Sequence, residues 1–73
     1  MTSFYKFQRM AFTELDKMIQ STMERKTDLN ISFIILNLTN KYEVSDKALK
    51  KRVQYWIESY DQLELKDNIL RCK

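Results

Sequence analysis

The chain of 73 residues contains neither glycine nor proline. Glycine supplies positive φ angles at tight turns and proline ends helices, so the two residues that usually separate elements are both missing. Turns must instead be made by Asn, Asp and Ser, whose short polar side chains bond to nearby backbone groups. The same absence disfavours glycine-rich phosphate loops, collagen-like repeats and proline-rich ligands.

The length predicts one small domain covering residues 1–73, with a core of modest size. Apolar residues make up 44% of the chain and charged residues 32%, which favours a folded unit over a disordered tail. No histidine is present, so the chain alone cannot assemble a Ser-His-Asp triad or a His-ligated metal site. We therefore expect a non-catalytic domain with no metal and no cofactor.

The cysteine content and the absence of long apolar runs bear on the cellular compartment of the protein. The single cysteine, Cys72, cannot form an internal disulfide, which fits a reducing compartment. No run of about 18 apolar residues occurs, and the opening residues lack the apolar core of a secretion signal. These features predict a soluble intracellular protein with no membrane contact.

The first third of the chain predicts one amphipathic helix over residues 4–25. Its apolar positions recur at spacings of three and four: Phe4, Phe7, Ala11, Leu15, Met18 and Thr22 or Met23. Ser3 is one candidate for the helix start, and Thr13 with Asp16 is a second one inside the pattern. The aromatic cluster Phe4-Tyr5-Phe7 either folds back onto the core or forms a contact surface.

Two further helices follow, separated from the first by the polar connection "ERKTDLN", where Asp28 and Asn30 favour a turn and a helix start. In "ISFIILNLTNKY" a helical spacing unites Ile31, Ile34, Ile35, Leu38 and Tyr42; a buried strand is the alternative, and we choose the helix. Ser45 is a good N-cap for a third helix that runs from Asp46 to Tyr60. Its apolar face holds Leu49, Val53, Trp56, Ile57 and Tyr60, with Lys47, Lys51, Gln54 and Glu58 opposite.

The last residues predict a β-hairpin. Leu63 and Leu65 alternate with charged residues, "KDN" supplies turn chemistry, and Ile69 to Lys73 can return as a second strand. Asp67 and Asn68 tolerate left-handed backbone, which a tight hairpin without glycine requires. The predicted fold class is α+β, a winged helix with a three-helix helix-turn-helix core and a C-terminal two-stranded hairpin as the wing.

The third helix carries the main candidate for a functional surface, a cationic cluster of Lys47, Lys50, Lys51 and Arg52. In a helix-turn-helix protein this helix enters the major groove of DNA. However, Glu58 would repel phosphate, and the net charge of the chain is only +3. A solvated face, a protein-binding face and a DNA-binding face therefore all stay open. Trp56 is predicted to be a core anchor, and an outward Tyr55 beside cations can mark an interface.

Four segments carry a resemblance to a known family. "RKTDLN" looks like the Arg-Lys segment that follows the first helix, and "FIILNLTNKYEVS" looks like the second helix and its exit. "ALKKRVQYWIESYDQLEL" looks like a Leu-Lys-Lys-Arg-Ile helix leading into a Tyr-Leu-Glu strand, and "NILRCK" corresponds to the closing strand. In this order they resemble the C-terminal winged-helix domain of cullins, the scaffold subunits of multi-subunit RING ubiquitin ligases. The chain would then be the C-terminal fragment of a longer protein.

The sequence also departs from that family. Cullins carry a lysine that accepts a ubiquitin-like modifier just before the Arg-Lys pair, but Met23 or Glu24 aligns there, and Lys26 matches the pair itself. Glu43 stands where cullins often have proline, and Trp56 where many have leucine. Missing the acceptor lysine points to a divergent branch of the family, and we carry modifier attachment onto no residue of this chain.

The resemblance implies a non-catalytic part of a ubiquitin ligase in the nucleus and cytoplasm. Its partners would be the RING-finger subunit and a ubiquitin-conjugating enzyme; nucleic acid is the less favoured partner, and no small-molecule substrate is implied. From helical periodicity, and not from a family motif, the predicted partner surface comprises Lys47, Lys50, Lys51 and Tyr55, with Lys66 and Arg71 of the hairpin. A DNA-binding winged-helix regulator and a purely structural cap are the alternatives.

Overall fold

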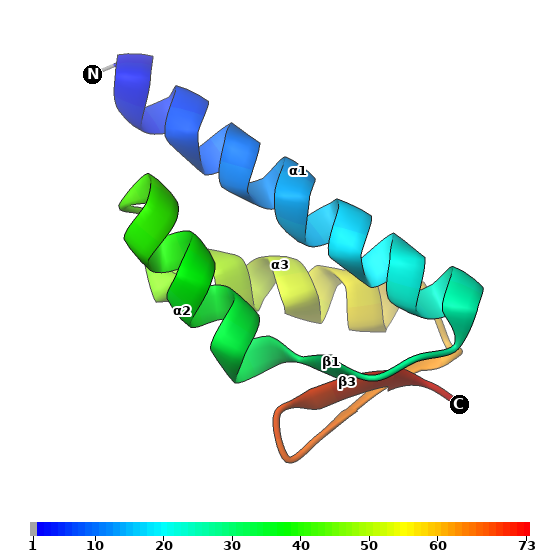
Figure 1. Ribbon diagram of the computed structural model, residues 1–73. Coiled ribbons are helices and arrows are strands. Elements are labelled where there is room, and N and C mark those ends of the chain that lie inside the picture. The colour runs from blue at the N-terminus through cyan, green and yellow to red at the C-terminus, as the bar shows by residue number, and fades with distance from the viewer. Residues whose placement is uncertain (1) are drawn as a thin grey trace.

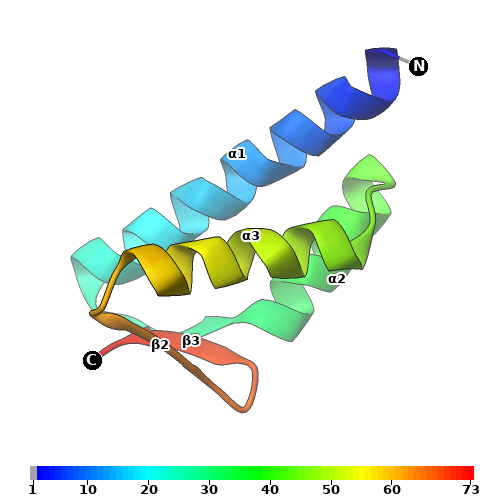
Figure 2. The ribbon, with the colours of Figure 1, turned by 180° about the vertical axis from the view of Figure 1, so that it is seen from behind.

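The computed structural model describes residues 2–73, with side chains described from residue 7 onward. Its elements run in the order α1 (Thr2–Arg25), β1 (Leu29–Asn30), α2 (Ile31–Tyr42), α3 (Asp46–Ser59), β2 (Leu63–Lys66) and β3 (Ile69–Cys72). The fold is α+β, with three helices and a three-stranded antiparallel sheet in the order β1-β3-β2. Figures 1 and 2 show the long α1 lying across α2 and α3, with the sheet closing the opposite side of the helices.

Polar side chains cap the starts of α2 and α3, and a left-handed residue ends α2. Asn30 Oδ1 accepts a hydrogen bond from the Phe33 backbone N-H at 3.1 Å, and Ser45 Oγ accepts one from the Lys47 N-H at 3.1 Å. These two bonds confirm the predicted starts of the two helices. Past the end of α2, Glu43 takes the left-handed conformation with φ of 55°. Proline is locked near −65°, so it cannot replace Glu43 in this backbone, although cullins often have proline there.

Helix α1 begins at Thr2, so the prediction that it starts after Ser3 or at Thr13 is wrong. Thr13 lies inside the helix, where its hydroxyl donates to the Arg9 carbonyl at 2.9 Å instead of capping the helix. The buried stripe consists of Ala11, Leu15, Ile19 and Thr22. The sequence prediction put Met18 in place of Ile19; Met18 is half-buried beside it.

The N-terminal end of α1 bears on the predicted aromatic cluster. Phe7 is 43% exposed, so the alternative in which the cluster folds back onto the core is wrong for this member of it. The side chains of Phe4 and Tyr5 lie outside the described part of the structure. No helix within residues 2–73 is both long enough and apolar enough to cross a membrane.

The hairpin of β2 and β3 is confirmed, with Leu63 opposite Cys72 and Lys66 opposite Ile69. Asp67 and Asn68 form its two-residue turn with φ of 53° and 63°, the double left-handed geometry that suits the twist of a hairpin. The prediction of a two-stranded sheet is wrong, because β1 pairs with the other side of β3. A strand of two residues shows no alternation, which is why the sequence pattern could not predict it.

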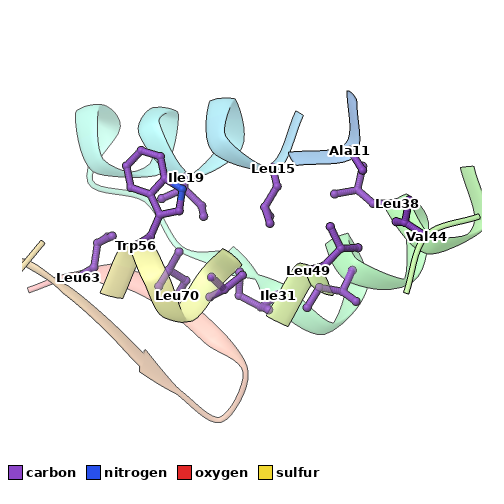
Figure 3. Packing of buried hydrophobic residues seen from close by; sticks show 12 residues of the cluster. Ala11, Leu15, Ile19, Ile31, Leu38, Val44, Leu49, Trp56, Leu63 and Leu70 are labelled. Carbon is purple, nitrogen blue, oxygen red and sulfur yellow. The ribbon is translucent and has the colours of Figure 1, made fainter. Parts of the chain in front are cut away.

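A single apolar cluster joins all three helices to the sheet (Figure 3). Its fully buried large side chains are Leu15, Ile19, Leu38, Leu49 and Leu70. Each such side chain contributes about 1.5–3 kcal/mol through removal of apolar surface from water. Trp56 is 6% exposed, as predicted for a core anchor, and stacks on the Tyr60 ring with centroids 5.1 Å apart. The core fixes α1 and α3 side by side, and this positions the surface described next.

Candidate functional site

The partly buried carboxylate of Asp16 holds α3 against α1. Asp16 of α1 accepts hydrogen bonds from Arg52 Nε at 3.0 Å, Arg52 Nη2 at 2.7 Å and Trp56 Nε1 at 2.6 Å. The hydrogen bonds to Asp16 raise the pKa of the Arg52 guanidinium above its ordinary value. Both side chains are at most a third exposed, so the pair is only partly screened by water. Arg52 is therefore held in place by Asp16, whereas a guanidinium that reads a base in a DNA groove must be free to bond to it.

A surface cleft of about 470 Å³ opens between α1 and α3 beside this contact. Helix α1 contributes Gln8 and Phe12, and α3 contributes Lys47, Ala48, Lys51, Arg52 and Tyr55. The guanidinium carbon of Arg52 lies 5.5 Å from the Phe12 ring centroid and 5.0 Å from that of Tyr55, within the range of cation-π attraction. We name this hollow the cationic cleft.

Three of the six predicted partner-binding residues meet at the cationic cleft, namely Lys47, Lys51 and Tyr55. Lys47 and Lys51 form no ion pair with any side chain among residues 7–73. Tyr55 is 55% exposed, as its outward position on the helix predicted. Sequence periodicity could identify these residues on α3, but it could not identify Gln8 and Phe12 on the facing helix.

The other three predicted residues lie elsewhere. Lys50 lines a different groove and faces Asp46 at 3.7 Å, with both side chains more than half exposed. Lys66 and Arg71 border a third hollow beside the sheet. Arg71 Nε bonds to Glu64 at 2.8 Å across the hairpin, and this bond raises the Arg71 pKa. The predicted surface is therefore three separate patches, two of which are partly neutralised within the chain.

The groove that contains Lys50 is the larger hollow, about 590 Å³ between α2, α3 and β2. Its floor and walls are mainly apolar: Ile31, Ile35, Leu36, Val53 and Leu65. Leu36 is 59% exposed and Leu65 is 41% exposed. Leu63 and Leu65 lie on the same face of β2, as strand alternation predicted; Leu63 is buried in the core, whereas Leu65, nearer the hairpin turn, lines the groove. We name this hollow the apolar groove.

The remaining polar residues on α3 bear on DNA recognition. Gln54, an amide on the outward face of this helix and of a type that can read adenine, donates from Nε2 to Glu58 Oε2 at 3.2 Å. Glu58 thus occupies the amide and adds negative charge to the same face. Both effects weaken a major-groove reading of α3.

A second polar contact joins α1 to the end of α2. Lys41 Nζ lies 2.8 Å from Glu14 Oε1, and the Tyr42 hydroxyl donates to the same oxygen. The bonds to Lys41 and then Tyr42 lower the pKa of Glu14, while the bond to Glu14 raises the pKa of Lys41 and of Tyr42. The contact ties α1 to the C-terminal end of α2, so we assign it to stability.

In comparisons with known proteins, the chain matches no protein-family model, no curated protein and no solved structure. Within the described residues, no group of three or more His, Cys, Asp or Glu side chains is arranged to hold a metal ion. What the fold and the site define is an α+β domain with one cationic and one apolar hollow on either side of the same helix.

Proposed function

We propose that the chain is a protein-binding winged-helix module, with α1 to α3 as the helical core and the β2–β3 hairpin as the wing. The observation that carries the proposal is the character of the surface around α3. On one side the helix displays Tyr55 with Lys47 and Lys51, which form no ion pair with the side chains of residues 7–73, and on the other side it borders an apolar groove. A DNA-reading helix is flanked by phosphate-binding cations, whereas apolar and aromatic patches of this kind favour a protein partner.

The particular protein that we propose is a cullin-like scaffold of a multi-subunit RING ubiquitin ligase. Within that family we propose a likeness to the divergent cullin subunit of the anaphase-promoting complex, because "STMERK" lacks the acceptor lysine and "DQLELKDNILR" resembles its wing. Such a role places the module in cell-cycle control. This proposal rests on the resemblance of the sequence segments. Glu43 departs from the family pattern, because it has a positive φ where cullins often have proline.

In this function the module contributes by positioning. It would hold the RING subunit or the ubiquitin-charged conjugating enzyme near the bound substrate, which raises the effective concentration of the reacting groups. No acid, base or nucleophile of its own is needed for that. The partner surface would be centred on Lys47, Lys51 and Tyr55 of the cationic cleft, whereas Lys50 and the pair Lys66 and Arg71 lie on two other patches.

Chemical-shift mapping tests the proposal. The ¹⁵N-labelled chain is titrated with ubiquitin-conjugating enzymes and, separately, with duplex DNA, and the titrations are repeated with Lys47→Glu/Lys51→Glu. We expect shifts around α3 with an enzyme, lost in the double variant. DNA binding that is steep in salt, with no response to any enzyme, would support the DNA-binding alternative instead. A response to neither would support the structural cap.

A further inference from the structure

The cationic cleft combines unsatisfied positive charge with an apolar floor. No Asp or Glu among residues 7–73 lines it. The nearest carboxylate in the contact network, Asp16, is already occupied by Arg52 and Trp56. Lys47 and Lys51 stand one helical turn apart on α3, and both are exposed. The positive charge of the cleft therefore favours binding of carboxylates or phosphates from another molecule.

The floor of the cleft restricts that molecule further. Phe12 and Ala48 are half-buried in it, and the Tyr55 ring forms an exposed wall, steadied by Arg52. Apolar surface of this kind gains from contact with an apolar side chain, which a phosphate backbone does not offer. Asp46 and Glu58, at the two ends of α3, also limit how far a continuous run of phosphates could follow the helix. A peptide can meet both requirements, because it can offer carboxylates to the lysines and an apolar side chain to the floor of the cleft.

We infer that the cationic cleft binds a short acidic segment of a partner protein, with one apolar side chain on Phe12 and Ala48 and two carboxylates at Lys47 and Lys51. In an extended segment, residues i and i+2 point the same way about 7 Å apart, which suits two lysines one helical turn apart. The inference rests on the proposed function for its claim that the partner is a protein, and it names the chemistry that this partner must present.

Binding of a defined peptide tests the inference. The probe is a ten-residue synthetic peptide in which four glutamates surround one phenylalanine, titrated into the ¹⁵N-labelled 73-residue chain at 50 and 150 mM NaCl. We expect shifts at Phe12, Lys47, Lys51 and Tyr55, and weaker binding at the higher salt. Replacing the glutamates by glutamines, or the phenylalanine by serine, weakens the interaction at least about fivefold.

Variants of the chain separate this site from general charge attraction. Lys47→Glu/Lys51→Glu raises the dissociation constant by about tenfold or more, because two attractions become repulsions. The matched control Lys26→Glu/Lys73→Glu makes the same change in net charge at exposed positions near the far end of α1 and at the C-terminus. It should change the dissociation constant less than about threefold, which reflects screened long-range attraction. Circular dichroism verifies that every variant stays folded.

Several results would overturn the inference: no peptide binding at millimolar concentration, equal effects of the two double variants, or equal binding of the glutamine peptide. Tighter binding of a 12-base-pair duplex DNA than of the acidic peptide at 150 mM NaCl would also overturn it. The peptide experiment uses no ubiquitin-conjugating enzyme. If the acidic peptide bound but no ubiquitin-conjugating enzyme did, the ubiquitin-ligase proposal would be wrong and the peptide site would stand. If an enzyme bound but the acidic peptide did not, the peptide site alone would be wrong.

Discussion

Replacing Asp16 by alanine should destabilise the domain strongly for a change at a partly exposed side chain. The substitution removes three hydrogen bonds that join α1 to α3, two from Arg52 and one from Trp56. Trp56 is 6% exposed, so its indole N-H would lose its partner where water cannot easily replace it. Arg52 would keep its charge without a counter-ion beside the cationic cleft.

The size of the effect follows from these two losses. A buried donor left unpaired costs about 1–3 kcal/mol. The Arg52 side chain is 32% exposed and can turn toward water, so the loss of its ion pair adds about 1 kcal/mol. A total of about 2–4 kcal/mol compares with roughly 4–11 kcal/mol for the whole stability of a domain of this size. The melting temperature should fall by about 10 °C or more.

Thermal and urea unfolding followed by circular dichroism measure this change. The matched control is Asp61→Ala, which removes an exposed carboxylate from the connection after α3. The control should change the unfolding free energy by no more than about 0.5 kcal/mol. If Asp16→Ala lowered the stability no more than Asp61→Ala does, the three hydrogen bonds would not hold α3 on α1 and the geometry assigned to the cleft would be wrong.

Three further predictions concern the core, the polar contact at Glu14 and the helix end at Glu43. Leu38→Ala should cost about 2–5 kcal/mol in urea unfolding because Leu38 is 2% exposed, whereas Leu36→Ala, at a 59% exposed position, should cost about 0.5 kcal/mol or less. The Glu14 carboxyl has a pKa below its ordinary value of 4.5, so its contribution to stability is present above pH 4.5 and is lost as the pH falls through the lower, folded-state pKa. Tyr42→Phe removes one of the two bonds and should raise the Glu14 pKa toward 4.5 in a ¹³C carboxyl titration; an unchanged midpoint would contradict the contact. Glu43→Gly should raise stability by about 0.5–1 kcal/mol because glycine accepts φ of 55° without strain, whereas Glu43→Pro should cost about 3 kcal/mol or more, both measured by thermal melts.

Local signals in the sequence predicted most of the architecture. The caps at Asn30 and Ser45 and the turn at Asp67 and Asn68 depend on residues that are adjacent in the chain, so their chemistry can be read directly. Helix α2 was ambiguous between helix and strand by composition, and its spacing gave the right answer. Strand β1 escaped prediction because its pairing with Leu70 and Ile69 depends on a strand some 40 residues later in the chain.

The candidate site was predictable only in part, for the same reason. Periodicity on α3 placed Lys47, Lys51 and Tyr55 outward, and all three are exposed. The cleft exists because Phe12 and Gln8 of α1 face them, and the spacing within one helix carries no information about which side of another helix it meets. The sequence pattern assigned Arg52 to a basic surface because its partner, Asp16, lies 36 residues away in the chain.

The account's central claim is that the surface around α3 serves a protein partner. The most direct measurement is a ranking of affinities by fluorescence anisotropy at 150 mM NaCl, with the 73-residue chain against a panel of ubiquitin-conjugating enzymes and a labelled duplex DNA. The account predicts that at least one enzyme binds more tightly than the DNA, and that Lys47→Glu/Lys51→Glu abolishes this preference while Lys26→Glu/Lys73→Glu retains it. DNA binding tighter than that of every enzyme would contradict the claim.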